Sequence, residues 1–109
     1  MATRANIIID QGADFRTSIE LTDDDGYAID LSGFTGSAQM RKYYNSSRVY
    51  DFTVSFDSDN SVVLIEMSAN TTNTIPSGRY VYDCEVTDSA NVKTRLVEGI
   101  VTVTPGVTR

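Results

Sequence analysis

Three neighbouring residues, Asp83, Cys84 and Glu85, are of the types that catalysis most often uses. In an extended strand the two carboxylates lie on one face, roughly 7 Å apart, where they could act as a general acid and base. Cys84 points to the other face and could act as a nucleophile. Such a nucleophile needs an activating base beside it, so the rest of the composition decides whether these residues form a site.

The chain contains no histidine and a single cysteine. The lack of histidine removes the commonest general base and metal ligand, and it excludes Ser-His-Asp and Cys-His catalysis. One cysteine excludes an internal disulfide and a cysteine-cluster metal site. We therefore interpret Cys84 as a small buried hydrophobe, and Asp83 and Glu85 as an outward face turned to solvent or a partner. We predict no catalytic and no cofactor-binding residues, and the chain is expected not to be an enzyme.

Two acidic turns, at residues 23–26 and 57–60, could supply oxygen ligands to calcium. An EF-hand loop needs a glycine at its sixth position and a glutamate at its twelfth, and counting from Asp23 or Asp57 finds neither. An irregular weak site stays open as the alternative to ordinary turns, where aspartate is favoured because it bonds to nearby backbone. We predict no metal-ligating residues.

The net charge of −6 and the isoelectric point near 4.4 restrict the class of partner. Nine basic residues are scattered among fifteen acidic ones, which argues against nucleic acid and anionic membranes. The longest apolar runs, residues 7–9 and 62–65, fall far short of the roughly 20 residues that span a bilayer. The N-terminus lacks the apolar region of a signal peptide. We expect a soluble protein made in the cytoplasm, with no small-molecule substrate.

Apolar and polar residues alternate along most of the chain, which indicates half-buried strands. Strands are expected at residues 15–22, 27–31, 37–43, 50–56, 61–68, 80–87 and 92–104. Seven or eight short strands separated by turns are typical of an antiparallel β-sandwich. Residues 69–75 break the alternation and predict one helical turn before Pro76. Gly99 indicates a bulge or a close backbone approach within the last strand.

The 109 residues are expected to form one domain, with residues 1–6 as a flexible arm. Most aromatic residues follow the strand alternation and are assigned to the core, although ten of them could also suggest a carbohydrate platform. Tyr43 and Tyr44 cannot both point inward on a regular strand, so one is expected to be exposed beside Arg41, Lys42 and Arg48. Arg41, Tyr43 and Tyr44 are the candidate contact residues, and the alternative is an ordinary solvated loop.

Several motifs along the chain resemble those of small virion proteins of tailed bacteriophages. They are DQGADF at 10–15, IDLSGFT at 29–35, AQMR at 38–41, PSGRYVYD at 76–83, RLVEGIVTVTP at 95–105 and VTR at 107–109. The pattern resembles the immunoglobulin-like domain at the N-terminus of siphophage upper-baseplate proteins. It is also similar to short structural proteins of contractile-tailed marine phages. Unlike the baseplate proteins, the chain has no downstream region, so we expect no fibre anchored through a C-terminal extension.

The resemblance implies an immunoglobulin-like antiparallel β-sandwich of seven to eight strands without enzymatic activity. It implies a structural or adaptor role in tail, baseplate or fibre assembly, with other virion proteins and copies of the same chain as partners. The protein would then be made in the host cytoplasm and reside in the virion. The alternative function is a carbohydrate- or host-surface-binding module. Arg41 and Arg95 are expected to pair with carboxylates across the sheets.

Overall fold

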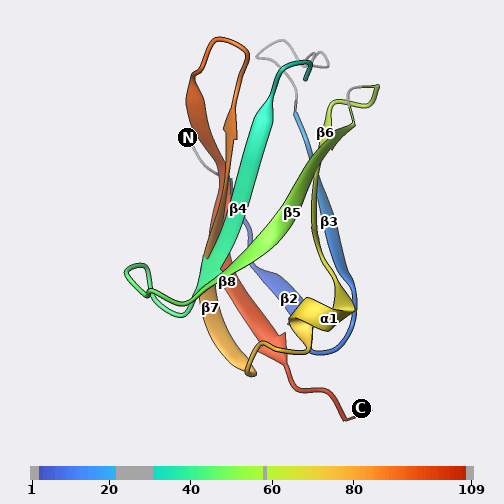
Figure 1. Ribbon diagram of the computed structural model, residues 1–109, viewed down its shortest axis with the longest axis vertical. Coiled ribbons are helices and arrows are strands. Elements are labelled where there is room, and N and C mark those ends of the chain that lie inside the picture. Colours follow the sequence, from blue (N-terminus) through green and yellow to red (C-terminus); the bar gives the residue numbers. More distant parts are fainter. Residues whose placement is uncertain (1–2, 22–30, 58, 108–109) are drawn as a thin grey trace.

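The computed structural model describes residues 3–21, 31–57 and 59–107, and strands make up most of them (Figure 1). The elements are β1 (Thr3–Arg4), β2 (Ile7–Asp10), β3 (Phe15–Glu20), β4 (Thr35–Arg41), β5 (Val49–Asp57), β6 (Val62–Met67), α1 (Ala69–Thr72), β7 (Gly78–Thr87) and β8 (Lys93–Thr104). The predicted all-β fold is confirmed. The acidic turn expected at residues 23–26 and the extended segment at 27–30 lie outside the described residues. No described helix is long and apolar enough to cross a membrane.

Two sheets form a sandwich, and β5 belongs to both of them. β5 pairs with β4 up to the Ala38–Phe52 pair, and from Thr53 onward it pairs with β6. The first sheet holds β1, β2, β8, β7, β4 and the first half of β5, and the second holds the rest of β5, β6 and β3. In the immunoglobulin fold, strands C, F and G share one sheet and strands B, E and D share the other. The pairings β4–β7–β8 and β3–β6–β5 reproduce that arrangement.

The N-terminal strands run parallel to β8, so the sandwich is mixed, while all the other described strand pairings are antiparallel as expected. β1 pairs with β8 at Thr3–Val97, and β2 follows in the same direction from Ile7–Val101. The Ala5 N–H donates to the Glu98 carbonyl at 2.9 Å between the two strands. Residues 3–6 therefore lie along β8 instead of forming a flexible arm, because β8 offers them an otherwise unpaired edge.

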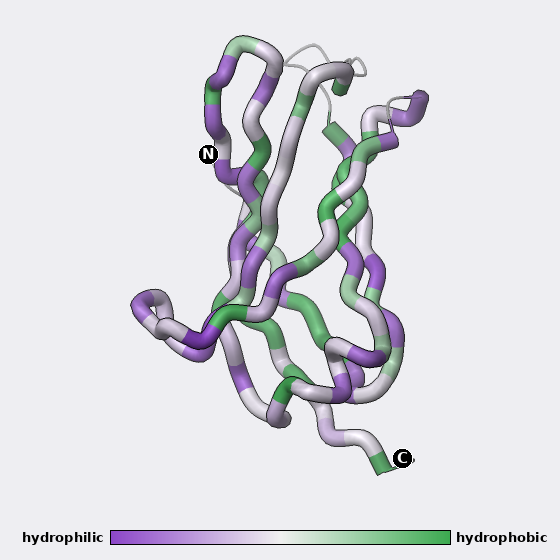
Figure 2. Tube along the Cα trace, in the orientation of Figure 1, coloured by the Kyte–Doolittle hydropathy of each residue, from purple (hydrophilic) through white to green (hydrophobic). Residues whose placement is uncertain are grey.

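The core lies between the sheets and follows the predicted alternation, as Figure 2 shows in the hydropathy of successive strand residues. Phe52, at the point where β5 changes sheet, packs against Phe15 of the second sheet with ring centroids 5.9 Å apart. On its other side it meets the Tyr82 ring at 6.3 Å, edge to face. Aromatic pairs in this range stabilise a core beyond the area they bury, so Phe52 links the two sheets.

The segment from β6 to β7 forms a corner that closes the lower end in Figure 1. The expected helical turn is α1, whose N-terminus is capped by the Ser68 side chain. The buried Thr72 hydroxyl donates to the Ala13 carbonyl at 2.8 Å and accepts from the Gly12 N–H at 3.1 Å. Tyr80, near the start of β7, donates its hydroxyl to the Pro76 carbonyl at 2.6 Å. This bond, from near the start of a strand to the backbone four residues upstream, has the geometry of the tyrosine corner of immunoglobulin-like folds.

Gly99 sits in a regular ladder opposite Tyr82, so the predicted bulge at this position is wrong. The register shift falls three residues earlier, where Cys84 faces Val97 and the next pair skips Leu96. The other reading, a close backbone approach, is confirmed. A Cβ at residue 99 would overlap the carbonyl oxygen of Ala5, which also accepts a 2.6 Å bond from the Tyr82 hydroxyl. Glycine is thus needed for β1 to reach β8.

The substitution Gly99→Ala should lower the free energy of unfolding by about 1–3 kcal/mol, the usual cost of overpacking. Chemical denaturation measures the change. In a chain lacking residues 1–5 the same substitution should cost much less, because the Ala5 carbonyl is gone. An equal loss in both backgrounds would contradict this role of Gly99.

Candidate partner-binding surface

The β4–β5 loop, residues 42–48, projects sideways from the lower end of the sandwich (Figure 1). Arg41 braces it from the last position of β4, with Nη1 donating to the Ser46 carbonyl at 2.5 Å. The Ser46 N–H donates to the Tyr43 carbonyl at 3.0 Å, and the Arg48 N–H donates to Ser46 Oγ at 3.3 Å. The loop therefore has a shape of its own, fixed by bonds within residues 41–48.

Both tyrosines of this loop are exposed, although the sequence predicted only one. Tyr43 is 66% exposed and Tyr44 is 80% exposed. The predicted strand over residues 37–43 ends at Arg41, so the alternation that would turn Tyr43 inward no longer applies. The other large exposed hydrophobic residues among those described are single side chains elsewhere in the chain, at Ile8, Val92 and Val107. Two adjacent exposed tyrosines are therefore a local concentration of apolar surface.

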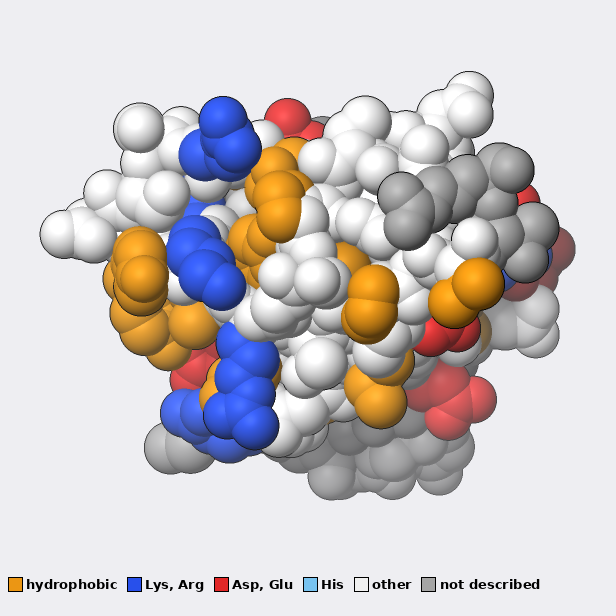
Figure 3. Space-filling model, turned by 90° about the horizontal axis from the view of Figure 1, so that it is seen from below, with side chains coloured by type: hydrophobic (Ala, Val, Ile, Leu, Met, Phe, Trp, Pro, Cys, Tyr) orange, Lys and Arg blue, Asp and Glu red, His pale blue; other side chains and the backbone are white. Residues whose placement is uncertain are grey.

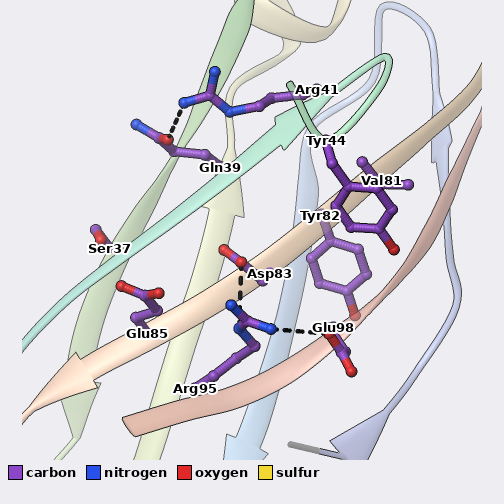
Figure 4. A pocket seen from close by; sticks show the side chains of 10 residues that line it. All are labelled: Ser37, Gln39, Arg41, Tyr44, Val81, Tyr82, Asp83, Glu85, Arg95 and Glu98. Atoms are coloured by element: carbon purple, nitrogen blue, oxygen red, sulfur yellow. Dashed lines mark hydrogen bonds and ion pairs between the residues drawn. The ribbon is translucent and has the colours of Figure 1, made fainter. Parts of the chain in front are cut away.

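A shallow groove of about 250 Å³ runs beneath Tyr44 on the outer face of the first sheet (Figure 4). Its lining comes from β4, β7, β8 and the loop: Ser37, Gln39, Arg41, Tyr44, Val81, Tyr82, Asp83, Glu85, Arg95 and Glu98. In Figure 4 the ring of Tyr44 lies beside Val81 at one end of the groove. The strands that form the floor are paired on both sides at Gln39 and Asp83, so the groove presents side chains and no open sheet edge there.

Charges in the groove are arranged around Arg95. Its guanidinium lies 3.5 Å from the Asp83 carboxylate and 3.3 Å from that of Glu98. Burial raises the pKa of Asp83, Arg95 opposes that shift, and the neighbouring carboxylates of Glu85 and Glu98 add to it. Arg95 thus pairs with carboxylates as expected, but within one sheet and not across the sandwich.

Arg41 does not form the carboxylate pair predicted for it among the described residues. Its second nitrogen, Nη2, donates to Gln39 Oε1 at 3.2 Å, and Gln39 in turn donates to Asp51 at 2.8 Å. The physical reason is its position at the end of β4, where the nearest acceptors are the loop carbonyl and the Gln39 amide. Of the three candidate contact residues, Arg41 therefore positions the loop, while Tyr43 and Tyr44 present the surface.

A second hollow, which we call the basic cleft, lies next to the same loop. It has a volume of about 220 Å³ and is lined by Lys42, Arg48, Tyr50, Pro76, Ser77 and Tyr80. Lys42 Nζ lies 4.9 Å from the centroid of the Tyr80 ring, within cation–π range. The Tyr50 and Tyr80 rings meet edge to face at 6.1 Å. Burial raises the pKa of the Tyr80 hydroxyl, the nearby Tyr50 adds to this, and Arg48 opposes it.

Sequence reasoning did not find the basic cleft, because Tyr50 and Tyr80 were assigned to the core by their alternation. Tyr80 is buried, but Tyr50 is only half-buried and faces the cleft. The basic residues themselves were recognised beside the exposed tyrosine, but their position next to Tyr50 and Tyr80 was not. Three of the nine basic residues, Arg41, Lys42 and Arg48, fall within eight positions of a chain whose net charge is −6.

Cys84 lies in the core with no exposed surface, as predicted. Burial, followed by the negative charges of Asp83 and Glu85, raises the pKa of the Cys84 thiol to about 11. A thiol in this state is a poor nucleophile near neutral pH, because the thiolate is the reactive form. Among the described residues, no group of three or more His, Cys, Asp or Glu side chains could hold a metal ion.

Comparisons with known proteins support the fold. No protein-family model and no curated protein matches the chain. Among solved structures, the chain is similar to an internalin-like protein of Listeria monocytogenes, with a TM-score of 0.52 and 14% identity. The similarity covers 94% of this chain but only 28% of that one, and at this identity it concerns the fold alone. It is consistent with the all-β sandwich that the strand pairings define.

An alkylating reagent at pH 8 should react with Cys84 at least about 100-fold more slowly in the native than in the unfolded protein. The thiolate fraction accounts for that factor, since the pKa of Cys84 rises from 9.0 to about 11 on folding. Because folding raises the pKa of Cys84, the folded state favours the protonated thiol. Its contribution to the free energy of unfolding is fully present below pH 9 and is lost as the pH rises through 11. Equal rates with and without denaturant would show that the thiol is accessible in the folded state.

Proposed function

We propose that this chain is a non-enzymatic structural or adaptor protein of a bacteriophage virion, acting in the assembly of the tail, baseplate or fibres. It is made in the host cytoplasm and joins the particle through contacts with other virion proteins. The resemblance of its sequence motifs to small virion proteins supports this role. The observation that carries it is the exposed pair Tyr43 and Tyr44 on a loop braced by Arg41.

The physical case for a docking loop has two parts. Tyrosine is enriched among the residues that dominate binding energy, because it buries a large ring and keeps a polar hydroxyl. A loop that already has a fixed shape loses little conformational entropy on binding, and Arg41 and Ser46 fix this one. An exposed aromatic pair on such a loop is suited to protein–protein contact.

Replacing both Tyr43 and Tyr44 with alanine should reduce incorporation of the protein into purified particles by roughly tenfold or more. Quantitative mass spectrometry of the particles measures incorporation. Val92→Ala, which removes an exposed apolar side chain from the β7–β8 turn at the opposite end, is the matched control and should change little. Normal incorporation of the double variant would exclude the loop as the docking surface, and absence of the unaltered protein from particles would exclude the virion role.

A second candidate function is carbohydrate or host-surface binding, and the outer groove favours it. Tyr44 offers an exposed aromatic ring at one end of the groove, and Gln39 and Glu85 line it with an amide and a carboxylate. Planar groups of this kind can bond to neighbouring hydroxyls, and the lining offers both donors and acceptors. At about 250 Å³ the groove lies just below the usual range of small-ligand sites, which fits a short saccharide.

For this second candidate, a glycan array should give hits that are lost in Tyr44→Ala and in Glu85→Gln. The first substitution removes the ring and the second removes a charged acceptor, while neither side chain belongs to the core. Thr94→Ala, an exposed change on β8 outside the groove, serves as the control. An array without hits for the folded protein removes carbohydrate binding from consideration.

A further inference from the structure

Lysine and arginine side chains gather at one end of a protein that is acidic as a whole. Lys42 and Arg48 line the basic cleft, and Arg79 lies exposed near the start of β7, two residues after the cleft residue Ser77. Figure 3 shows Lys and Arg side chains in a row at this end, bordered by hydrophobic ones. The ion pairs among the described residues all involve Arg16 or Arg95. The three cations at this end therefore have no carboxylate partner within the described part of the chain.

Three carboxylates, those of Asp57, Asp59 and Asp88, lie at the opposite end, on the β5–β6 and β7–β8 turns (Figure 1). Asp57 accepts bonds from the Asp59 N–H at 3.2 Å and from the Asn60 side chain at 2.9 Å. Asp88 accepts from two backbone N–H groups of its own turn, both at 2.9 Å. These two carboxylates shape their turns, whereas the exposed Asp59 carboxylate has no bond to any described residue. It is free to meet a cation.

The distribution of charge decides how two copies of this chain can approach. With a net charge of −6, copies lying side by side repel each other. A head-to-tail approach instead brings the cations of Lys42, Arg48 and Arg79 to the acidic end of the next copy. At 0.1 M salt the Debye length is about 10 Å, so only charges in near contact contribute strongly to this preference.

We propose that copies of this protein associate head to tail, with the basic cleft of one copy receiving the Asp59 carboxylate of the next. The Asp59 carboxylate then lies between Lys42 and Arg48, and the rings of Tyr50 and Tyr80 form the wall of the cleft. An aromatic wall lowers the local dielectric, and charge-assisted bonds are stronger there than in open water. This inference rests on the proposed function, in which the same end of the molecule is the docking surface, and it names the partner as a second copy.

A contact of this type joins two different patches, and each copy carries both of them. Such a heterologous interface forms a ring if the rotation closes and a filament if it does not. One copy can bind two neighbours at the same time, because the basic cleft and Asp59 lie at opposite ends. The assembly therefore grows beyond a dimer as the protein concentration rises, whereas an isologous contact would stop at two copies.

The test is the oligomeric state of the purified full chain, measured by analytical ultracentrifugation between low and high salt. At low salt the mean mass should rise with concentration beyond two copies of the 12.0 kDa chain, and it should return to one copy at high salt. Arg48→Glu and Asp59→Lys should each weaken association by at least about tenfold, because each puts like charges together. Combined in one chain, the two changes restore the opposite charges in exchanged positions and should recover association.

The matched control is Arg16→Glu, a charge reversal on the second sheet that removes the ion pair with Glu66. It changes the net charge as Arg48→Glu does, so equal effects of the two would overturn the proposal. A wild-type protein that stays monomeric at low salt would also overturn it, as would a double variant that fails to associate while its circular dichroism is native. Asp59→Asn, which only removes the charge, should give an intermediate loss.

The outcomes for this inference and for the virion role are separable. A chain that is monomeric in solution but present in particles contradicts head-to-tail association and keeps the virion role. A chain that associates as described but is absent from purified particles contradicts the virion role and keeps the association.

Discussion

The sharing of β5 between two sheets is the constraint on which the rest of the structure depends. The strand leaves β4 after Phe52 and joins β6 from Thr53, so the two sheets are covalently continuous at that point. Phe52 is therefore held between Phe15 and Tyr82, one ring from each sheet. To reach the second sheet, β5 runs diagonally across the sandwich, and the loop before it starts well to the side (Figure 1). The exposed tyrosines stand on that loop because of this diagonal path.

Much of the fold could be predicted because each strand repeats with a period of two. The alternation of Tyr50, Phe52, Val54 and Phe56 placed β5 almost to its ends, and the break before Pro76 located α1. Pairing could not be predicted in the same way. Alternation states which face of a strand is buried, but it does not state the neighbour or its direction. The parallel docking of β1 and β2 on β8 therefore appears only in three dimensions, and so does the shared use of β5.

The candidate surface was predicted in part, for a related reason. Tyr43 and Tyr44 were found because two adjacent aromatic residues cannot both face the core of a strand. The basic cleft was missed because it joins residues 42–50 to residues 76–80, two segments that meet only in three dimensions, where the Tyr50 and Tyr80 rings are in contact. Gly99 shows the same limit. Only glycine fits at this position because the Ala5 carbonyl lies against it, and Ala5 is 94 residues away in the sequence. Local sequence patterns were enough to single out some of these residues, but the role of each one depends on contacts with distant parts of the chain.

Cys84, whose side chain points from β7 into the core, bears on whether the fold depends on a disulfide. Many immunoglobulin-like domains join their sheets by a disulfide, and their stability then follows the redox potential of the compartment. Here the sheets are joined by the shared strand and by aromatic contacts, and Cys84 is the only sulfur that could be oxidised to a disulfide. Its thiol is enclosed and held in the protonated form. No disulfide within this sequence therefore contributes to the free energy of folding, and the folded state itself presents no reactive thiol to an oxidant.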